Sequence, residues 1–185
     1  MPQSHVTKNF GTQQIRIAKL LTDPAGGSAT YASSIQLVGA KEFQLTGTVN
    51  LKQLRGDNQL LAVDGVPGDL TLKIKHAKLN LDALTVLEGG TLADTGSSPN
   101  QVTTYDYLGG TSLVYWKVEC QNVAVDTPGG DLHYILWKCV MSMFPIQGTM
   151  EEDYDIYELE CRPMPRISDN RWKQVVLNQT AVAPG

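Results

Sequence analysis

The sequence has 185 residues, of which 42% are hydrophobic, and it carries a formal net charge of −4 with an isoelectric point near 5.3. This length and apolar content fit a single folded domain over residues 1–185. The acidic balance argues against a general binder of nucleic acid or anionic membranes, which would carry a basic stripe. We expect no secretory signal, because the N-terminus lacks an apolar core, and no membrane span, because no apolar run approaches ~18 residues.

The first part of the chain predicts two strands. A flexible N-terminus over 1–13 leads into a strand at 14–21, and a loop rich in Gly, Ser and Ala follows at 24–34. From 43 to 51, apolar residues alternate with neutral polar ones, which is the period of a half-buried strand. The polar face of this strand consists of Gln44, Thr46, Thr48 and Asn50.

The next stretch, 52–68, predicts a long hairpin that projects from the body. Turn-forming residues occupy 56–58 and 67–68, with apolar and charged residues between them. The tripeptide Arg55-Gly56-Asp57 also spells a cell-adhesion motif, and we interpret it as a turn because the chain shows no export signal.

The stretch from Asp69 to Gly90 changes its hydrophobic period with no Gly or Pro between its two halves. The first half alternates as a strand does, with an apolar face of Leu70, Leu72 and Ile74. The second half has the spacing of a short helix at about 80–88, anchored to the core by Leu81, Leu84 and Leu87. Asn80 is suited to cap the first turn, and Gly89 is suited to end the helix in a left-handed conformation.

The second half of the chain predicts further strands between long connections. Residues 90–112 form a polar stretch that we expect to be a long loop of the functional kind. Strands are expected at 114–120, 132–144 and 156–162. The strand at 132–144 is apolar on both faces, so we expect one face to be covered by something other than this domain's own core. Three prolines and weak alternation predict an extended arm at 163–185, and the whole pattern predicts a mainly β fold, a β-sandwich or β-barrel with one short helix.

No motif in the sequence indicates catalysis or metal binding. The three histidines lack an H-x-x-x-H spacing, and the nucleophile elbow, the P-loop and the dinucleotide motif are all missing. Three cysteines without a C-x-x-C predict reduced, mostly buried thiols. The acidic run at 151–155 lacks the spacing of a calcium loop and predicts a solvated loop or, alternatively, a charged rim that repels phosphate. We therefore expect no enzymatic activity, no cofactor and no metal.

The sequence DLTLKIKHAKLNLDALTVLEGG, Asp69 to Gly90, resembles the strand–helix signature of the major tail (tail tube) proteins of long-tailed, siphovirus-type bacteriophages. In that family an alternating apolar strand leads into a short helix that ends at paired glycines. The preceding LRGDNQLLAVDG is similar to the family's charged turn entering a short strand. The resemblance in element order covers most of the chain, but not the loop at 90–112 or the arm at 163–185.

The resemblance implies a β-sandwich-like tail tube fold flanked by a helix. Such subunits close into hexameric rings, and the rings stack into a hollow tube that conducts DNA into the host. The implied partners are further copies of the chain, the tail tip or initiator and terminator proteins, and the tape measure protein. DNA would pass through the lumen without specific binding, no membrane is involved, and the protein would reside in the virion tail.

The resemblance also implies roles for particular residues. A lumen along which DNA slides should be polar or acidic, and the candidates are Gln44, Thr46, Thr48, Asn50, Glu158 and Glu160. Lys73 and Lys75 do not fit a pore lining, so we expect them to face a subunit interface or to pair with acids. The hairpin and the arm would contact adjacent rings through Arg55, Asp57, Asn58, Arg166 and Trp172.

Two other functions stay open from the sequence. One is the inner tube of a contractile tail or of a type VI-like secretion apparatus, which a neighbouring sheath gene would indicate. The other is a small-molecule-binding β-barrel, which predicts a stable monomer with a closed apolar cavity. The polar strand face at 44–50 argues against such a cavity.

Overall fold

The computed structural model describes residues 7–57, 59–126, 129–143, 148–151 and 154–185, and these form a mainly antiparallel β fold with one short helix. In chain order the elements are β1 (Asn9–Thr22), β2 (Thr30–Tyr31), β3 (Ile35–Leu37), β4 (Ala40–Gly56), β5 (Gln59–His76), α1 (Leu81–Leu87), β6 (Thr91–Thr95), β7 (Val102–Asp106), β8 (Tyr115–Ala124), β9 (Asp131–Met143), β10 (Gly148–Glu151), β11 (Tyr154–Pro163) and β12 (Lys173–Asn178). The predicted mainly β class with one helix is confirmed. In the described part of the chain, no helix is long and apolar enough to cross a membrane.

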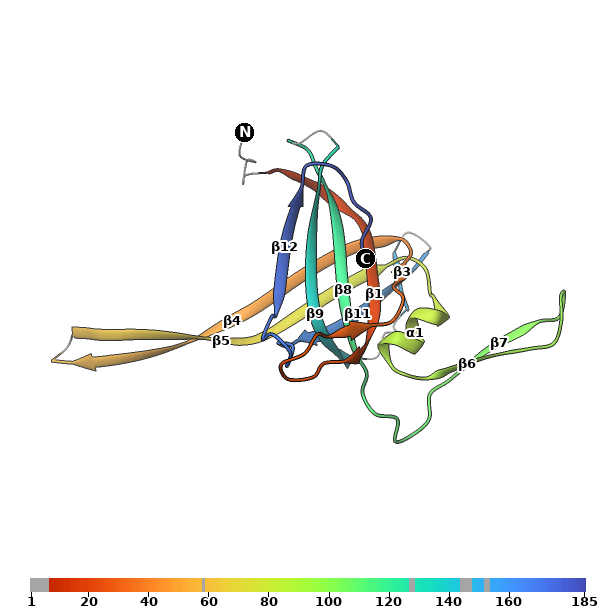
Figure 1. The fold of residues 1–185 in the computed structure, drawn as a ribbon, viewed down its shortest axis with the longest axis horizontal. Helices are drawn as coiled ribbons and strands as arrows, with labels where there is room; N and C mark the ends of the chain where they lie inside the picture. The colour runs from red at the N-terminus through yellow and green to blue at the C-terminus, as the bar shows by residue number, and fades with distance from the viewer. Residues whose placement is uncertain (1–6, 58, 127–128, 144–147, 152–153) are drawn as a thin grey trace.

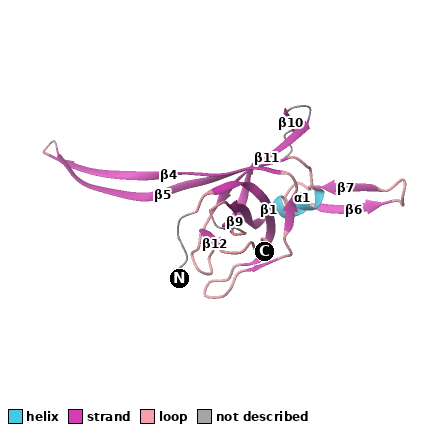
Figure 2. Ribbon diagram, turned by 90° about the horizontal axis from the view of Figure 1, so that it is seen from above, coloured by secondary structure: helices cyan, strands magenta, loops and turns pink. Residues whose placement is uncertain are grey.

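One strongly curled sheet makes up the body. Its strand order is β2-β1-β8-β9-β11-β5-β4, with β3 also on β1, β12 also on β9, and β10 on β11. The half with β4, β5 and β11 curls over the half with β1, β8 and β9 (Figure 2), and no ladder among the described residues joins β4 to β1 or β12. The sheet is therefore open between these edges rather than a closed barrel.

The hydrophobic core lies between the two halves of the curled sheet. Its buried side chains come from β1, β3, β5, β8, β9, β11 and α1, and include Ile15, Ile17, Leu37, Leu72, Ile74, Trp116, Val118, Leu136 and Leu159. Strand periodicity in the sequence accounts for the buried residues of β1, β5, β8 and β11, whereas β3 with Leu37 was not predicted and the alternation did not distinguish the two faces of β9.

Helix α1 closes one end of this core (Figure 1). Leu84 and Leu87 are 3% and 2% exposed, whereas Leu81 is half-buried. The Asn80 side chain accepts hydrogen bonds from the backbone N–H groups of Asp82 and Ala83, at 3.0 and 3.4 Å. Gly89 has a φ of +87°, so the helix ends in the left-handed conformation that glycine favours.

Two segments that were expected to lack regular structure contain strands. Residues 9–13, expected to be flexible, begin β1 and pair with β8, while residues 1–6 lie outside the described residues. The expected loop at 90–112 contains the hairpin of β6 and β7, paired from Thr91 opposite Asp106 to Thr95 opposite Val102. β-branched residues on both sides of a Gly-Ser-Ser-Pro-Asn turn favour this hairpin. Its strands are short and mostly exposed, so no apolar alternation marked them.

The arm expected at 163–185 does not extend away from the body. Its residues 173–178 form β12, which pairs with β9 from Lys173 opposite Leu136 to Asn178 opposite Asp131. The rest of the segment lies on the outer face of β8 and β9, through bonds such as Val182 N–H to the Asp131 carboxylate at 2.8 Å. The chain's own C-terminal part therefore covers the second apolar face of β9, which the sequence had suggested was covered by something outside this domain's core.

Strands β4 and β5 form a hairpin much longer than the predicted 52–68. They pair from Ala40 opposite His76 to Gly56 opposite Gln59. Strand β11 pairs with β5 only along 72–76, so the distal part of the hairpin leaves the body as a two-stranded ribbon (Figure 1).

Candidate assembly surfaces

The outer face of β4, β5 and β11 is polar and carries paired charges. In the cross-strand register, Gln44 lies opposite Lys73, and Lys73 lies opposite Glu160. The Lys73 ammonium is 3.6 Å from the Glu158 carboxylate and 3.7 Å from that of Glu160. The Lys75 ammonium is 3.0 Å from Glu42 and 3.9 Å from Glu158. Each lysine thus pairs with acids, which is one of the two expected arrangements. Because these side chains are partly exposed, the ion pairs add little to the free energy of unfolding.

Polar residues of this face continue onto the hairpin, where they are joined by two exposed apolar side chains, Val66 opposite Asn50 and Leu54 further out. A Cβ atom added to Gly68 would lie 2.5 Å from the Thr48 hydroxyl oxygen and 3.2 Å from the Asn50 amide nitrogen, so these two side chains meet over Gly68. Thr46 lies opposite Thr71, next to the charged rows. The six residues that the sequence suggested for a lumen therefore come from two strands of one sheet, β4 and β11. The structure brings them onto a continuous outer face.

The opposite face of the distal hairpin carries a cluster of uncovered apolar side chains, with the polar Gln53 opposite Val63. Val49, Leu51 and Val63 are 62%, 60% and 45% exposed. A Cβ atom on Gly65 would lie 3.2 Å from Val49 and 3.4 Å from Leu51, so these side chains flank one glycine on the same face. An isolated two-stranded ribbon is marginally stable in water, and a contiguous exposed apolar strip marks an interaction surface. We call Val49, Leu51 and Val63 the hairpin strip.

The hairpin strip lies on the core-facing side of β4. Toward the body, this side of β4 borders an open groove. This groove lies between β4 and β12 and is lined by Phe43, Leu45, Asn122, Tyr134, Ile135, Leu136, Lys173, Gln174 and Val175. The Phe43 and Tyr134 rings stack with centroids 6.3 Å apart, while Val175 on the far side is 54% exposed. The core is thus left open at the unpaired sheet edges, where another chain could cover it.

The residues expected to stack between rings do not all lie at exposed positions. Arg55 and Asp57 lie at the hairpin tip, where the Arg55 guanidinium donates to the Gln53 side chain, and Asn58 lies outside the described residues. Arg166 is only 9% exposed, so little of its side chain is available for a contact with another ring. It pairs with Asp169 and its guanidinium carbon lies 4.3 Å above the Trp137 ring.

Trp172 is also part of the body rather than a free contact. It is half-buried, and its backbone carbonyl accepts a hydrogen bond from the Trp137 N–H at 3.3 Å. The segment that follows β11 therefore packs on the outer face of β9, in contact with Trp137.

Asp23 binds the segment that follows β11 to the body of the subunit. Its carboxylate accepts the backbone N–H groups of Ile167 and Ser168, at 2.8 and 3.0 Å, and pairs with the buried Lys138 ammonium at 2.8 Å. Burial alone would raise the pKa of the Asp23 carboxyl, but these three donors outweigh it and lower the pKa well below its ordinary value of 3.8. The two backbone hydrogen bonds thus tie the loop after β1 to the segment after β11, and the ion pair ties the same loop to β9.

Replacing Asp23 with asparagine is expected to lower the free energy of unfolding by about 3 kcal/mol, because Lys138 would stay buried without a counter-charge. Urea denaturation measures this loss. Asp69→Asn is the control, because Asp69 and its partner Arg162 are 83% and 60% exposed, and it should cost less than about 0.5 kcal/mol. Since the Asp23 pKa is lowered on folding, its contribution is present above pH 3.8 and is lost as the pH falls below that value. An equal loss of unfolding free energy in both variants would contradict the stabilising role given to the buried Asp23–Lys138 ion pair.

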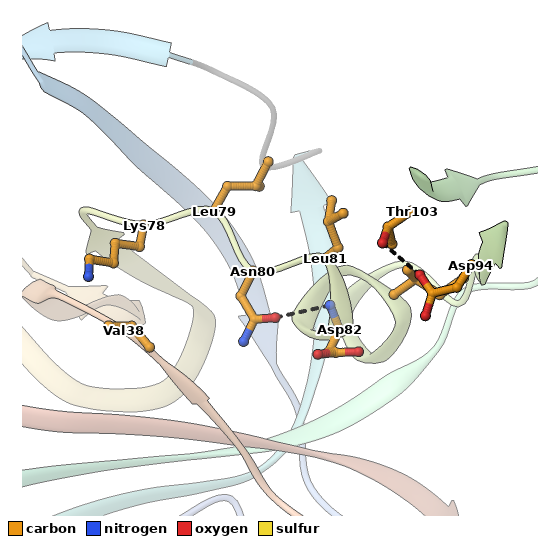
Figure 3. A pocket seen from close by; sticks show the side chains of 9 residues that line it. Val38, Lys78, Leu79, Asn80, Leu81, Asp82, Asp94 and Thr103 are labelled. Atoms are coloured by element: carbon orange, nitrogen blue, oxygen red, sulfur yellow. Dashed lines mark hydrogen bonds between the residues drawn. The ribbon is translucent and has the colours of Figure 1, made fainter. Parts of the chain in front are cut away.

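The pocket beside α1 does not have the character of a ligand cavity. It lies between the loop that precedes the helix and the β6–β7 hairpin, and Figure 3 shows Lys78, Asp82 and Asp94 among its lining side chains. The Asn80 side chain is occupied in capping the helix, and Asp94 accepts a hydrogen bond from Thr103 at 2.6 Å. This pocket is open and charged, unlike the closed apolar cavity of a small-molecule carrier.

The cysteines are free and buried, as the sequence predicted: Cys120, Cys139 and Cys161. Among the described residues, no group of three or more His, Cys, Asp or Glu side chains is arranged to hold a metal ion.

No protein-family model matches the sequence, and no curated protein matches it. Among solved structures, the chain is similar to one in the "Cryo-EM structure of the anti-feeding prophage (AFP) baseplate, 6-fold symmetrised". The match covers 95% of this chain and 97% of that one, with 10% sequence identity and a TM-score of 0.46.

Proposed function

We propose that this chain is a structural subunit of a phage-type tail tube. Copies join into rings, by the resemblance hexameric ones, and the rings stack into a hollow tube that conducts DNA. The observation that carries the proposal is the two-faced sheet of β4, β5 and β11. Over the body, one face is polar and solvent-exposed, and the other face runs from the core onto the hairpin strip.

The polar face suits a channel for DNA. Its ion-paired residues are Lys73, Lys75 and Arg162 together with Glu42, Asp69, Glu158 and Glu160, three cations against four anions, a net charge of −1. Strong DNA binding requires basic groups that neutralise phosphates. Here each lysine is paired with carboxylates, and the neighbouring Gln44 and Thr46 are neutral. DNA near such a surface would slide rather than bind.

The apolar surfaces suit contacts between copies. Ring closure would pair or cover the open sheet edges at β4 and β12, which removes the aggregation hazard of an unpaired edge. The hairpin strip would then pack on a neighbouring copy in the same or the adjacent ring. In this arrangement the subunit acts without catalysis, as part of the virion tail, with initiator, terminator and tape measure proteins as its other partners.

The proposal predicts that purified subunits polymerise when concentrated or when mixed with a tail initiator complex. Sedimentation velocity should resolve a slow monomer that converts into very fast species above a threshold concentration. A chain that stays monomeric under all these conditions contradicts the proposal and favours the small-molecule-binding alternative, whose prediction is a stable monomer.

The channel face makes a separate prediction. Replacing both Gln44 and Thr46 with lysine should leave tube formation intact but make tubes retain DNA roughly tenfold more strongly at low salt, with a steep loss as salt rises. Filter binding of labelled DNA to purified tubes measures the effect. The control places the same two charges on the β6–β7 hairpin, as Thr91→Lys and Thr104→Lys, where both residues are exposed. Equal retention by both variants would mean that the β4 face does not line the channel.

A further inference from the structure

The C-terminal segment, residues 179–185, crosses the outer face of β9 and β8 and ends beside β1 (Figure 1). Five hydrogen bonds hold it there. The N–H groups of Ala181, Val182 and Gly185 donate to the Gly129 carbonyl, the Asp131 carboxylate and the Glu119 carboxylate, at 2.5, 2.8 and 3.2 Å. In return, the side chains of Gln121 and Lys117 donate to the carbonyls of Val182 and Gly185, at 2.9 and 2.8 Å.

Beneath this segment, a buried histidine bridges the same two carboxylates. The Nδ1 atom of His133 is 2.6 Å from Glu119, and its Nε2 atom is 2.8 Å from Asp131. The three residues are 4%, 5% and 1% exposed, in that order. A carboxylate only accepts hydrogen bonds, so both ring nitrogens must donate, which requires the imidazolium form. A neutral ring would leave one nitrogen lone pair facing a buried carboxylate oxygen.

Among the ion-paired groups at this site, the charges balance when the ring is protonated, and the Arg16 guanidinium opposite Glu119 adds one further positive charge nearby. Strand β8 contributes Glu119 and Lys117, and β9 contributes Asp131. On β1, Arg16 lies opposite Glu119 but donates to Ser34, and β12 contributes only the neutral Asn178, which donates to Asp131 at 2.7 Å. Loss of the ring proton would leave the two carboxylates with one excess negative charge in a site from which the segment excludes water.

We propose that residues 179–185 form a latch that stays closed while His133 carries its second ring proton and opens when that proton is lost. Opening lets water reach the carboxylates of Glu119 and Asp131, and it uncovers the outer face of β8 and β9. This latch is a property of the folded subunit and holds whether or not the chain forms tubes.

The direction of the pH dependence follows from the site. Burial alone would lower the pKa of His133, but its hydrogen bonds to Glu119 and Asp131 outweigh burial and raise the pKa above its ordinary value of 6.5. The stabilisation of the closed latch is therefore fully present below pH 6.5 and is lost as the pH rises through the raised pKa. Burial alone would raise the pKa of Asp131, but hydrogen bonds from His133, Val182, Asn178 and Gln121 outweigh burial and lower it from 3.8 to about 2, so this carboxylate stays ionised across this range.

Amide hydrogen exchange tests the latch. Protection factors, which remove the intrinsic pH dependence of exchange, are measured for Val182 and Gly185 from pH 6 to pH 10. They should fall at least tenfold with a midpoint that matches the titration of the His133 ring followed by NMR. Protection of the core amides of Ile17 and Val118 should persist over the same range. Protection that is constant with pH, or that falls together with the core, overturns the proposal.

Two variants sharpen the test. Glu119→Gln keeps a hydrogen-bond acceptor but removes a charge that favours the imidazolium, so the opening midpoint should move down by about one pH unit. His76→Gln removes the other buried histidine in the described part of the chain, whose Nδ1 lies 2.8 Å from the Lys78 carbonyl oxygen, and should leave the midpoint unchanged. An unshifted midpoint in Glu119→Gln, or an equal shift in His76→Gln, would overturn the role of His133.

Discussion

Replacing Leu84 with aspartate is expected to unfold the subunit or leave it only marginally folded. Leu84 is 3% exposed on the face of α1 that closes the core, so the new carboxylate would be buried without a partner. The lost apolar contacts and the desolvated charge together cost on the order of 5 kcal/mol, which approaches the whole stability of a domain of this size. Urea denaturation followed by circular dichroism measures the loss, and tube assembly should fail with it.

The matched control is Leu79→Asp. It introduces the same charge five residues earlier, in the loop before the helix, at a side chain that is 46% exposed. It should change the free energy of unfolding by less than about 1 kcal/mol. A Leu84→Asp subunit as stable as this control would mean that the helix does not depend on its buried face.

Replacing Leu51 with aspartate is expected to abolish tube assembly while leaving the isolated subunit intact. Leu51 belongs to the hairpin strip and is 60% exposed, so the subunit itself loses little, within about 0.5 kcal/mol. In an assembled tube, however, the carboxylate would be buried against a neighbouring copy without a partner, and the contact would be lost. Thermal melts measure the first effect, and sedimentation velocity measures the second.

The adjacent residue supplies the control for this variant. Asn50→Asp adds the same charge to the opposite, polar face of the same strand, next to Thr48 and Gly68. It should allow assembly, because the proposal places this side chain in the channel. If both variants assembled, the hairpin strip would not be an interface. If both failed, charge on the hairpin rather than loss of the apolar contact would explain the result.

The elements with strong periodicity could be predicted from the sequence. The alternation at 70–74 predicted the buried Leu72 and Ile74 of β5. The leucine spacing predicted α1 and its cap at Asn80, although Leu81 is only half-buried and Ala83 and Val86 complete the buried face. Local patterns were sufficient for these two elements because, in each of them, one face packs against the hydrophobic core and the other does not. The hairpin was also predicted, but its length was underestimated, because its exposed apolar residues do not separate a buried face from a solvent face.

The errors concern contacts between residues distant in sequence. No local pattern near Arg166 indicates that it packs on Trp137. Likewise, no local pattern near Val182 indicates that its N–H group donates to the Asp131 carboxylate, 51 residues earlier in the chain. The segment after β11 was therefore expected to reach another subunit, although its best partners lie on its own β9. The bridge formed by His133 was missed for the same reason. Glu119 comes from a neighbouring strand, and only the register of β8 and β9 brings its carboxylate to the ring.

We propose that copies of this chain build a hollow tube lined by the outer face of β4, β5 and β11. Electron microscopy of concentrated protein, with helical reconstruction of any tubes, tests it directly. We expect tubes of uniform width in which the hairpin strip is covered by another copy and the channel is lined by Gln44, Thr46, Glu158 and Glu160. Tubes with this face turned outward or buried between subunits would contradict it.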